Sequence, residues 1–170
     1  MEMVKNGKEA SKFLNILENK IFYFHSYCNG YWTYTDENNH EHLFQKVNGE
    51  YIELTENINA KYVFIYNNDD WSYKDEKGYT HLYRFTNGEQ VELTKNVNAK
   101  YVKSYDNRDW SYEDGKEYYH LFRFIGNKWV ELTENVDAVY IESCNNGDWS
   151  YCDENGHYYF FNKKNKPLYK

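Results

Sequence analysis

The chain has 170 residues and a formal net charge of −7, and apolar residues make up 41% of it, with aromatic residues alone at 21%. This length suits one compact domain or one short repeat array, and 20 tyrosines with a single proline argue against disorder. The acidity disfavours general binding to nucleic acid, whose phosphates it would repel, but it is compatible with binding a basic protein surface.

The first part of the chain predicts one short helix. Over residues 8–19, an apolar stripe lies at positions i, i+3, i+4 and i+7, formed by Ala10, Phe13, Leu14 and Leu17. Because so short a helix is unstable alone in water, residues 1–20 are predicted to be a segment whose helix caps the domain that follows. The start of the chain lacks the apolar core of a signal peptide, and no stretch is apolar enough to span a membrane, which predicts a cytoplasmic protein.

After this segment, the chain repeats itself every 39 residues. The period is marked by four tryptophans, with no insertion or deletion between them: Trp32, Trp71, Trp110 and Trp149. Nine residues before each tryptophan stands a tyrosine: Tyr23, Tyr62, Tyr101 or Tyr140. This periodicity is the signature of a repeat protein, and it divides residues 21–170 into copies at about residues 21–60, 61–99, 100–138 and 139–170.

Each copy divides into four short strands. In the third copy they are expected at residues 101–105, 110–113, 118–124 and 129–132, which alternate or are rich in β-branched and aromatic residues. The last turn is Asn48-Gly49 in the first copy and Asn87-Gly88 in the second, and Asn-Gly favours a hairpin because both residues tolerate positive φ. The sequence therefore predicts an all-β domain of sixteen strands, built from four tandem repeats of four antiparallel strands each.

Two arrangements of the copies fit a unit of this size. Four four-stranded units could close into a four-bladed propeller-like ring, as the length of one copy matches a propeller blade. They could also stack as an open repeat array with caps at both ends. A barrel-like closure is the third alternative.

The eight residues that start at each tryptophan form a motif. In the second copy they are Trp71-Ser72-Tyr73-Lys74-Asp75-Glu76-Lys77-Gly78. The motif resembles the WG-repeat family, whose pattern is Trp-Gly-aromatic-x-Asp-x-x-Gly, although serine or threonine follows the tryptophan in every copy here. The resemblance implies a bacterial binding or scaffold repeat protein without a shared catalytic site.

The last copy contains a second motif, Asn155-Gly156-His157-Tyr158-Tyr159-Phe160-Phe161-Asn162. It resembles the Asn-Gly-x-Tyr-Tyr-Phe-Asn pattern of glucan- and choline-binding hairpin repeats in cell-wall proteins. This second resemblance implies carbohydrate binding.

A histidine recurs ten residues after the first three tryptophans, as His42, His81 and His120, with Tyr159 at the fourth position. A ring of equivalent histidines could bind a metal ion. Each histidine, however, shares a strand face with aromatic residues, which predicts a packing role. We therefore expect neither a metal nor a cofactor.

Recurrent carboxylates are predicted to be structural. The aspartate four residues after each tryptophan begins a turn, where it can cap its own backbone. A glutamate recurs in the fourth strand of the first three copies and is expected to pair with a neighbouring arginine or lysine, such as Arg84 or Arg123. These glutamates are Glu53, Glu92 and Glu131. Equivalent columns give near-identical environments, whereas a catalytic pair needs two different ones. Three cysteines fall in different columns and are predicted to be free thiols: Cys28, Cys144 and Cys152.

Function is expected in the loop just before each tryptophan, where the copies differ. Loops on a rigid scaffold tolerate change and carry recognition. Aspartates recur there, and repeated carboxylates along one rim would add their fields and attract a basic surface. The predicted partner-binding residues are Tyr31, Asp69, Asp70, Arg108, Asp109 and Asp148.

These features predict a non-catalytic binding protein rather than an enzyme. The expected partner is a protein with a basic surface. The chain is a candidate for an immunity- or anti-defence-type inhibitor, of bacterial or phage origin, that occupies a basic site. The alternative is a lectin-like carbohydrate-binding protein, because rows of tyrosine and tryptophan near Asn and Asp suit sugar stacking and hydrogen bonds to hydroxyl groups.

Overall fold

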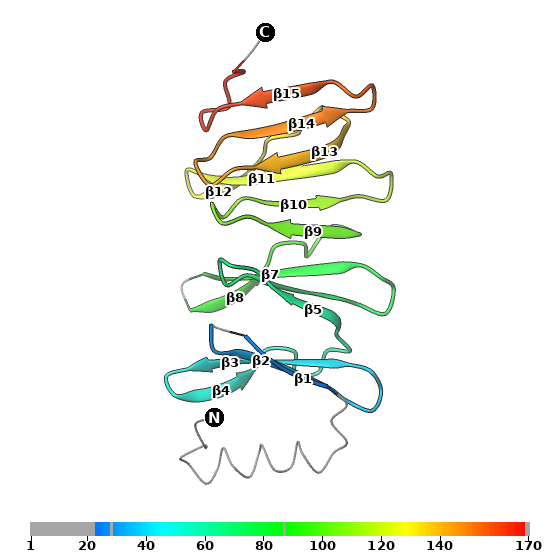
Figure 1. Ribbon diagram of the computed structural model, residues 1–170, viewed down its shortest axis with the longest axis vertical. Coiled ribbons are helices and arrows are strands. Elements are labelled where there is room, and N and C mark those ends of the chain that lie inside the picture. The colour runs from blue at the N-terminus through cyan, green and yellow to red at the C-terminus, as the bar shows by residue number, and fades with distance from the viewer. Residues whose placement is uncertain (1–22, 28, 87, 169–170) are drawn as a thin grey trace. The chain divides into compact units, whose positions relative to one another are not determined.

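The computed structural model describes residues 23–27, 29–86 and 88–168, and these residues form four antiparallel β-sheets (Figure 1). The predicted all-β repeat fold is confirmed. The predicted helix at residues 8–19 lies outside the described residues. In the part of the chain that is described, no helix is long and apolar enough to cross a membrane.

Each of the first three sheets is a four-stranded meander, in which sequential strands are neighbours. The first sheet consists of β1 (Tyr23–Ser26), β2 (Tyr31–Thr35), β3 (Glu41–Val47) and β4 (Glu50–Glu53). The second consists of β5 (Lys61–Ile65), β6 (Trp71–Lys74), β7 (Thr80–Thr86) and β8 (Glu89–Glu92). The third consists of β9 (Tyr101–Ser104), β10 (Trp110–Glu113), β11 (Tyr119–Ile125) and β12 (Lys128–Glu131).

The fourth sheet has three strands, which are β13 (Ala138–Ser143), β14 (Trp149–Asp153) and β15 (Tyr158–Phe161). The prediction of a sixteenth strand is therefore wrong for the described residues. A single bridge between Phe161 and Pro167 stands in its place. Pro167 has no N–H group to donate to a ladder, and the next residue bonds back through Leu168 N to Phe160 O at 2.8 Å.

The Asn-Gly turns adopt the backbone conformation that the sequence requires. Asn48 and Gly49 have φ values of 52° and 91°, and the reversed pair Gly126 and Asn127 has values of 55° and 68°. Two successive positive φ values match the right-handed twist of the flanking strands. These turns fix the register of the last two strands in each hairpin.

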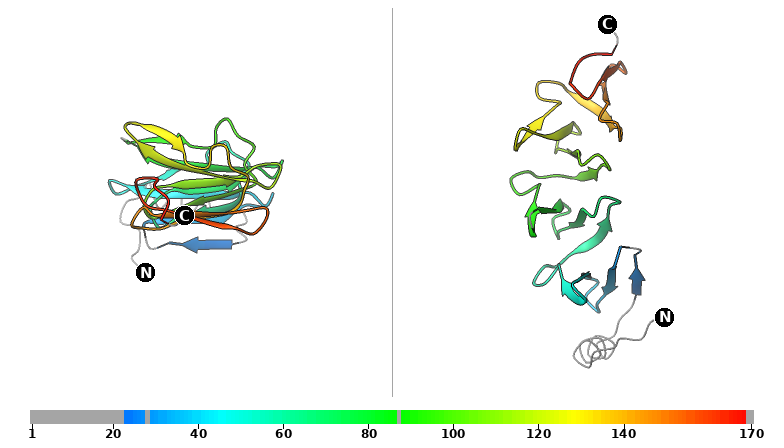
Figure 2. Two further views of the ribbon diagram at one scale, coloured as in Figure 1. Left: turned by 90° about the horizontal axis from the view of Figure 1, so that it is seen from above. Right: turned by 90° about the vertical axis from the view of Figure 1, so that its left-hand side faces the viewer.

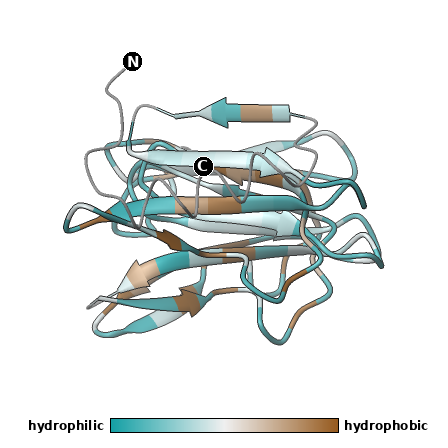
Figure 3. Cartoon of the chain, turned by 90° about the horizontal axis from the view of Figure 1, so that it is seen from below, coloured by the Kyte–Doolittle hydropathy of each residue, from teal (hydrophilic) through white to brown (hydrophobic). Residues whose placement is uncertain are grey.

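Stacked aromatic rings connect strands two and three of every copy. The tryptophan stacks on its register partner, with ring centroids 4.6 Å apart for Trp71 and Tyr83 and 4.5 Å apart for Trp110 and Phe122. Two residues further along, Tyr112 stacks on His120 at 4.7 Å. Because Tyr and Trp carry a polar group, the strands in Figure 3 contain pale and hydrophilic colours beside hydrophobic ones and form no uniformly hydrophobic runs.

The chain divides into two compact units, which are described separately. The first contains the first sheet, and the second contains most of the second sheet and all of the third and fourth. Within the second unit the three sheets follow one another in a row (Figures 1 and 2). There β7 contacts β9 and β11 contacts β13, so each copy packs on the next. The four sheets are separate among the described residues, so the repeats do not merge into one barrel.

Replacing Trp71 with alanine is expected to lower the free energy of unfolding by about 3–5 kcal/mol, because this ring is completely buried and leaves a large cavity. Urea denaturation followed by circular dichroism measures the loss. Tyr62→Ala, at an exposed position of the same sheet, is the control and should change stability by about 0.5 kcal/mol or less. Equal stability of both variants would contradict a structural role for the tryptophan column.

Candidate functional site

The loops before the tryptophans are the predicted partner-binding site, and the structure shows that two of their aspartates are buried. Asp70 is 1% exposed and makes a buried ion pair with Arg84, whose side chain is 3% exposed. Arg84 Nε donates to Asp70 Oδ1 at 2.8 Å, and its second nitrogen binds the other carboxylate oxygen. The arginine therefore neutralises the carboxylate through two parallel hydrogen bonds.

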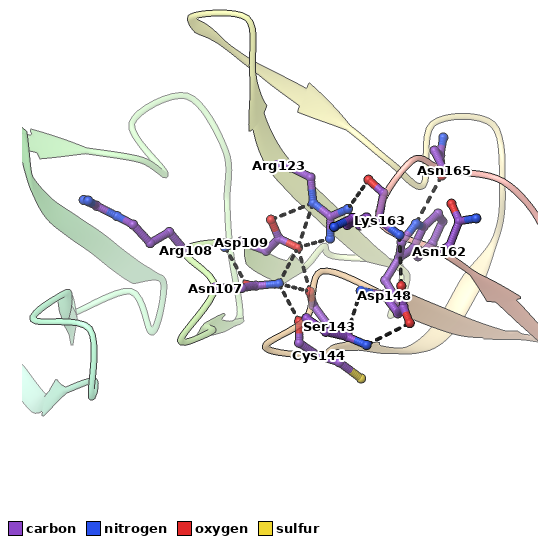
Figure 4. Close-up of polar contacts among 12 residues, drawn as sticks. Asn107, Arg108, Asp109, Arg123, Ser143, Cys144, Asp148, Asn162, Lys163 and Asn165 are labelled. Atoms are coloured by element: carbon purple, nitrogen blue, oxygen red, sulfur yellow. Dashed lines mark hydrogen bonds and ion pairs between the residues drawn. The ribbon is translucent and has the colours of Figure 1, made fainter.

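The same arrangement recurs 39 residues later (Figure 4). Asp109 is 2% exposed. Its carboxylate accepts a hydrogen bond from Arg123 Nε at 3.0 Å and another from the Ser143 hydroxyl at 2.6 Å. Ser104 bonds Asp70 in the equivalent way, at 2.5 Å. Because each serine belongs to the first strand of the following copy, the aspartate joins one copy to the next.

An asparagine completes this junction. Asn68 Nδ2 donates to Ser104 Oγ at 2.8 Å and to the carbonyl of Tyr105 at 2.9 Å. Asn107 donates in the same way to Ser143 Oγ and to the carbonyl of Cys144, both at 2.8 Å. We call each set of Asp, Arg, Asn and following Ser a clamp: Asp70, Arg84, Asn68 and Ser104 in one, and Asp109, Arg123, Asn107 and Ser143 in the other.

The remaining predicted binding residues have different surroundings. Tyr31 is 1% exposed, and its hydroxyl accepts a hydrogen bond from Gln45 Nε2 at 2.7 Å. Asp148 is half-buried, and its Oδ1 accepts from the backbone N of Lys163 at 3.0 Å. Asp69 and Arg108 are exposed, and Arg108 points away from the clamp in Figure 4. Because Tyr31, Asp70 and Asp109 are buried, the six residues do not form one exposed acidic rim.

The predicted pairing of the fourth-strand glutamates with a neighbouring arginine or lysine is wrong, because each contacts a histidine. Glu92 lies opposite Tyr83 in the register of β7 and β8, so it shares a face with His81 and not with Arg84. The contact is instead His81 Nδ1 to Glu92 Oε1 at 2.7 Å, and the same distance joins His42 to Glu53 and His120 to Glu131. Alternation of side chains along a strand is the physical reason for the difference.

The packing role predicted for the histidines is confirmed by their contacts. His42 stacks on Tyr34 with ring centroids 4.4 Å apart, and His120 also lies 3.5 Å from Asp114. The Glu53 carboxylate raises the pKa of His42 above its usual value, because the hydrogen bond favours the protonated ring. Within the described ranges, no group of three or more His, Cys, Asp or Glu residues is placed to hold a metal ion.

The aspartates after the tryptophans cap their turns as predicted. Asp36 Oδ1 accepts from the backbone N of Asn38 and of His40, both at 2.9 Å, and Asp114 and Asp153 repeat the pattern. These bonds contribute to lowering the pKa of all three carboxyl groups. Cys144 and Cys152 are free thiols as predicted, and Cys28 lies outside the described residues.

A surface site appears in the second unit where the sequence did not place one. The tyrosines nine residues before each tryptophan are exposed, with values of 59% for Tyr101 and 49% for Tyr140. Between these two rings lies a pocket of about 240 Å³, at the junction of the third and fourth copies. We call it the tyrosine pocket, and its lining is Tyr101, Val102, Lys103, Tyr105, Ser111, Tyr119, Tyr140 and Ile141.

Charged groups surround the rings of this pocket. The Tyr140 hydroxyl donates to Glu142 Oε2 at 2.9 Å, and Lys103 Nζ lies 3.2 Å from Glu142 and 4.6 Å from the centroid of the Tyr105 ring. Burial and a hydrogen bond with the Glu113 carboxylate raise the pKa of Tyr119 to about 12. Its phenol therefore remains neutral at physiological pH and keeps its hydrogen bond with Glu113.

An acidic hollow adjoins the tyrosine pocket. Tyr119 lines both, and the hollow contains three glutamates against one lysine, its lining being Glu113, Lys116, Glu117, Tyr118, Tyr119, Val139 and Glu154. Both Glu117 and Glu154 are exposed. Aromatic faces next to carboxylates provide the chemistry that attracts a cationic group.

The sequence held a signal for this pocket. Tyr101 alternates with Val102 along β9, and the equivalents of Val102 at positions 63 and 141 are buried apolar residues. A tyrosine kept in every copy on the opposite face from these residues must point outward.

Comparison with protein-family models finds no match, and comparison with curated proteins finds none either.

The buried ion pair of the clamp predicts that replacing its aspartate with asparagine strongly lowers the stability of the fold. Asp70→Asn is expected to cost about 3–5 kcal/mol of unfolding free energy, because it leaves the Arg84 guanidinium buried without a counter-charge. Asp137→Asn, on the exposed surface, is the matched control and should stay within about 0.5 kcal/mol of wild type. Chemical denaturation measures both, and an equally small loss for Asp70→Asn would show that the aspartate is not holding the fold.

The pair of His42 and Glu53 predicts a dependence of stability on pH. Because folding raises the pKa of His42, its contribution is fully present below the unfolded value near 6.5 and is lost as pH rises through the folded pKa. The stability difference between wild type and Glu53→Gln should therefore be largest near about pH 6 and shrink towards about pH 9. Denaturation at several pH values tests this, with Glu50→Gln on the same strand as control. A difference that grows with pH would contradict it.

Proposed function

We propose that this chain is a non-catalytic binding protein that engages a protein partner with a basic surface through the tyrosine pocket and the acidic hollow beside it. The observation that carries the proposal is that the pocket lined by the exposed rings of Tyr101 and Tyr140 adjoins a hollow lined by the carboxylates of Glu117 and Glu154. Exposed aromatic rings in a concave, partly apolar site are the usual anchors of a protein interface.

The chemistry favours an arginine or lysine side chain of the partner. Such a side chain can lay its cationic head over a tyrosine face while nearby carboxylates provide the opposite charge. Lys103 already does this within the chain, between the Tyr105 ring and Glu142. The net charge of −7 would speed association with a basic surface and make it sensitive to salt.

Binding is favoured over catalysis because the recurrent titratable groups are already paired inside the chain. His42, His81 and His120 bond glutamates, and Asp70 and Asp109 bond arginines. A small acidic protein that blocks a basic site would be an inhibitor of the immunity or anti-defence type, and a cytoplasmic location is part of this proposal.

Carbohydrate binding is the second candidate, and the exposed tyrosine column favours it. Tyr23, Tyr62, Tyr101 and Tyr140 recur at the same place in each copy, and all four are exposed. Flat, exposed rings of this kind could stack on sugar units.

The test uses the full chain as bait in its source cell. Wild type and a Tyr101→Ser/Tyr140→Ser variant are compared, and a captured protein is then purified and titrated at several salt concentrations. Loss of both rings is expected to weaken binding by about thirtyfold, which corresponds to about 2 kcal/mol.

The matched control is Tyr62→Ser, an equally exposed tyrosine of the same column that does not line the pocket. It should bind like wild type. A partner whose binding is independent of both Tyr101 and Tyr140 would contradict the proposed site. Binding on a glycan array, weakened by every tyrosine of the column, would favour carbohydrate instead.

A further inference from the structure

A hollow of about 450 Å³ lies beside the clamp of Asp109, where the third copy meets the fourth within the second unit. Four of its lining residues are cationic and one is acidic, although the whole chain has a net charge of −7. We call it the basic hollow. Its cationic lining residues are Arg108, Arg123, Lys163 and Lys164.

The carboxylates at the basic hollow are already bonded within the chain. Asp109, its acidic lining residue, is buried and paired with Arg123. Asp148 lies next to the hollow, and its Oδ1 accepts from the backbone N of Lys163 at 3.0 Å. Within the described residues, the side chains of Lys163 and Lys164 make no ion pair with a carboxylate. The lining is therefore positive overall, and its two lysines are available to an anion.

The preceding junction of the second unit shows why this one is open. There the guanidinium of Arg84 lies 5.2 Å from the centroid of the Trp129 ring, and its Nη1 donates to the carbonyl of Arg108 at 2.9 Å. In the described part of the chain, the fourth copy has no fourth strand to supply an equivalent ring. The side chain of Arg123 is accordingly 12% exposed, against 3% for Arg84. The missing strand thus leaves a hollow where the earlier junction is covered.

The two lysines lie on a turn that hydrogen bonds hold in place. Asn162 Oδ1 accepts from the backbone N of Lys164 at 2.9 Å, and Arg123 Nη1 donates to the carbonyl of Lys163 at 3.3 Å. The turn is also bonded to the core, because the buried Trp149 donates from its indole N to the side chain of Asn165 at 3.1 Å. The lysines are therefore positioned before any ligand arrives, which lowers the entropic cost of binding.

A glycine allows this turn to lie close to the loop before Trp149. A Cβ atom at Gly147 would lie 3.0 Å from the Cβ of Lys163, closer than such atoms normally approach. The two preceding copies have Asp69 and Arg108 at this position, with φ values of 66° and 69°, so the backbone conformation alone does not require glycine. The absence of a side chain at residue 147 is what brings Lys163 to the hollow.

An exposed aromatic ring belongs to the same hollow. Phe124 lines it and is 55% exposed. The ring packs edge-to-face on Trp129 with centroids 5.2 Å apart, a contact that orients it and leaves much of its surface open. Cations that bind phosphate groups, combined with an aromatic ring on which a base can stack, provide the chemistry that recognises a nucleotide.

We propose that the basic hollow binds a nucleoside diphosphate, with its phosphates at Lys163 and Lys164 and its base against Phe124. Two phosphate groups match the two lysines, and Arg123 adds a further positive charge at the clamp. Arg108 also lines the hollow, but its side chain points away from the clamp in Figure 4, so no phosphate contact is assigned to it. The volume of about 450 Å³ is within the usual range for small-molecule sites.

Isothermal titration calorimetry of the full chain with ADP, pyrophosphate and adenosine tests the proposal. ADP is expected to bind, pyrophosphate to bind about tenfold more weakly because it lacks the base, and adenosine not to bind measurably. Lys163→Gln/Lys164→Gln should weaken ADP and pyrophosphate alike, by at least about tenfold. Phe124→Ser should weaken ADP by about tenfold and leave pyrophosphate unchanged.

The matched control is Lys128→Gln/Lys166→Gln, which removes the same charge from exposed lysines outside the lining. It should bind ADP within about twofold of wild type, since exposed charges at a distance are screened. Circular dichroism establishes that all variants are folded.

No heat of binding at about 1 mM ADP would overturn the proposal, as would an equal loss in the control pair. Pyrophosphate that binds as tightly as ADP would overturn the assignment of a nucleotide. A single-stranded oligonucleotide that binds more tightly than ADP, with the same dependence on the two lysines, would assign the site to nucleic acid instead. All of these variants retain the tyrosine pocket, so the outcome is independent of the proposed function.

Discussion

Stacking between aromatic rings at facing positions of strands two and three is the contact on which each copy depends. In every sheet a tryptophan and a tyrosine two residues later lie on rings of the neighbouring strand, which gives one face of the sheet an ordered core. In the second and third sheets, the opposite face contains a leucine that the next copy buries. A copy is thus only partly stable by itself, and its second face requires a neighbour, as in other repeat proteins.

Because each copy requires a neighbour on its second face, the loops and the strands have different roles. The loops before the tryptophans reach the next copy, and there their aspartates are used to hold two copies together. What remains available for recognition is the outer side of the first strands, where tyrosine rings border a pocket. The loops before the tryptophans are therefore used to connect the copies, and the outer side of the first strands is the surface on which we propose that binding occurs.

The sequence predicted the sheets well because a period without insertions identifies equivalent positions in all copies. The strand and turn assignments depended on local signals, such as the alternation in β10 and the Asn-Gly turns. The partners of charged side chains depended instead on which strand face each side chain occupies. Arg84 and Glu92 are close in sequence but lie on opposite faces, and Asp70 reaches Arg84 only because a hairpin brings them together. Burial of the loop aspartates required the following copy, so no single copy's sequence could reveal it.

The first copy has Tyr31 and Gln45 where the second and third copies have the aspartate and arginine of the clamp, and this difference has a consequence for the gene. Tandem repeats can lose or gain whole units. Loss of the third copy would put the fourth after the second and keep an aspartate ahead of a serine. Loss of the second would put Tyr31 and Gln45 ahead of Ser104, whose hydroxyl would then lack the carboxylate that accepts its hydrogen bond. The chain can therefore change its length at one point in the series more readily than at another.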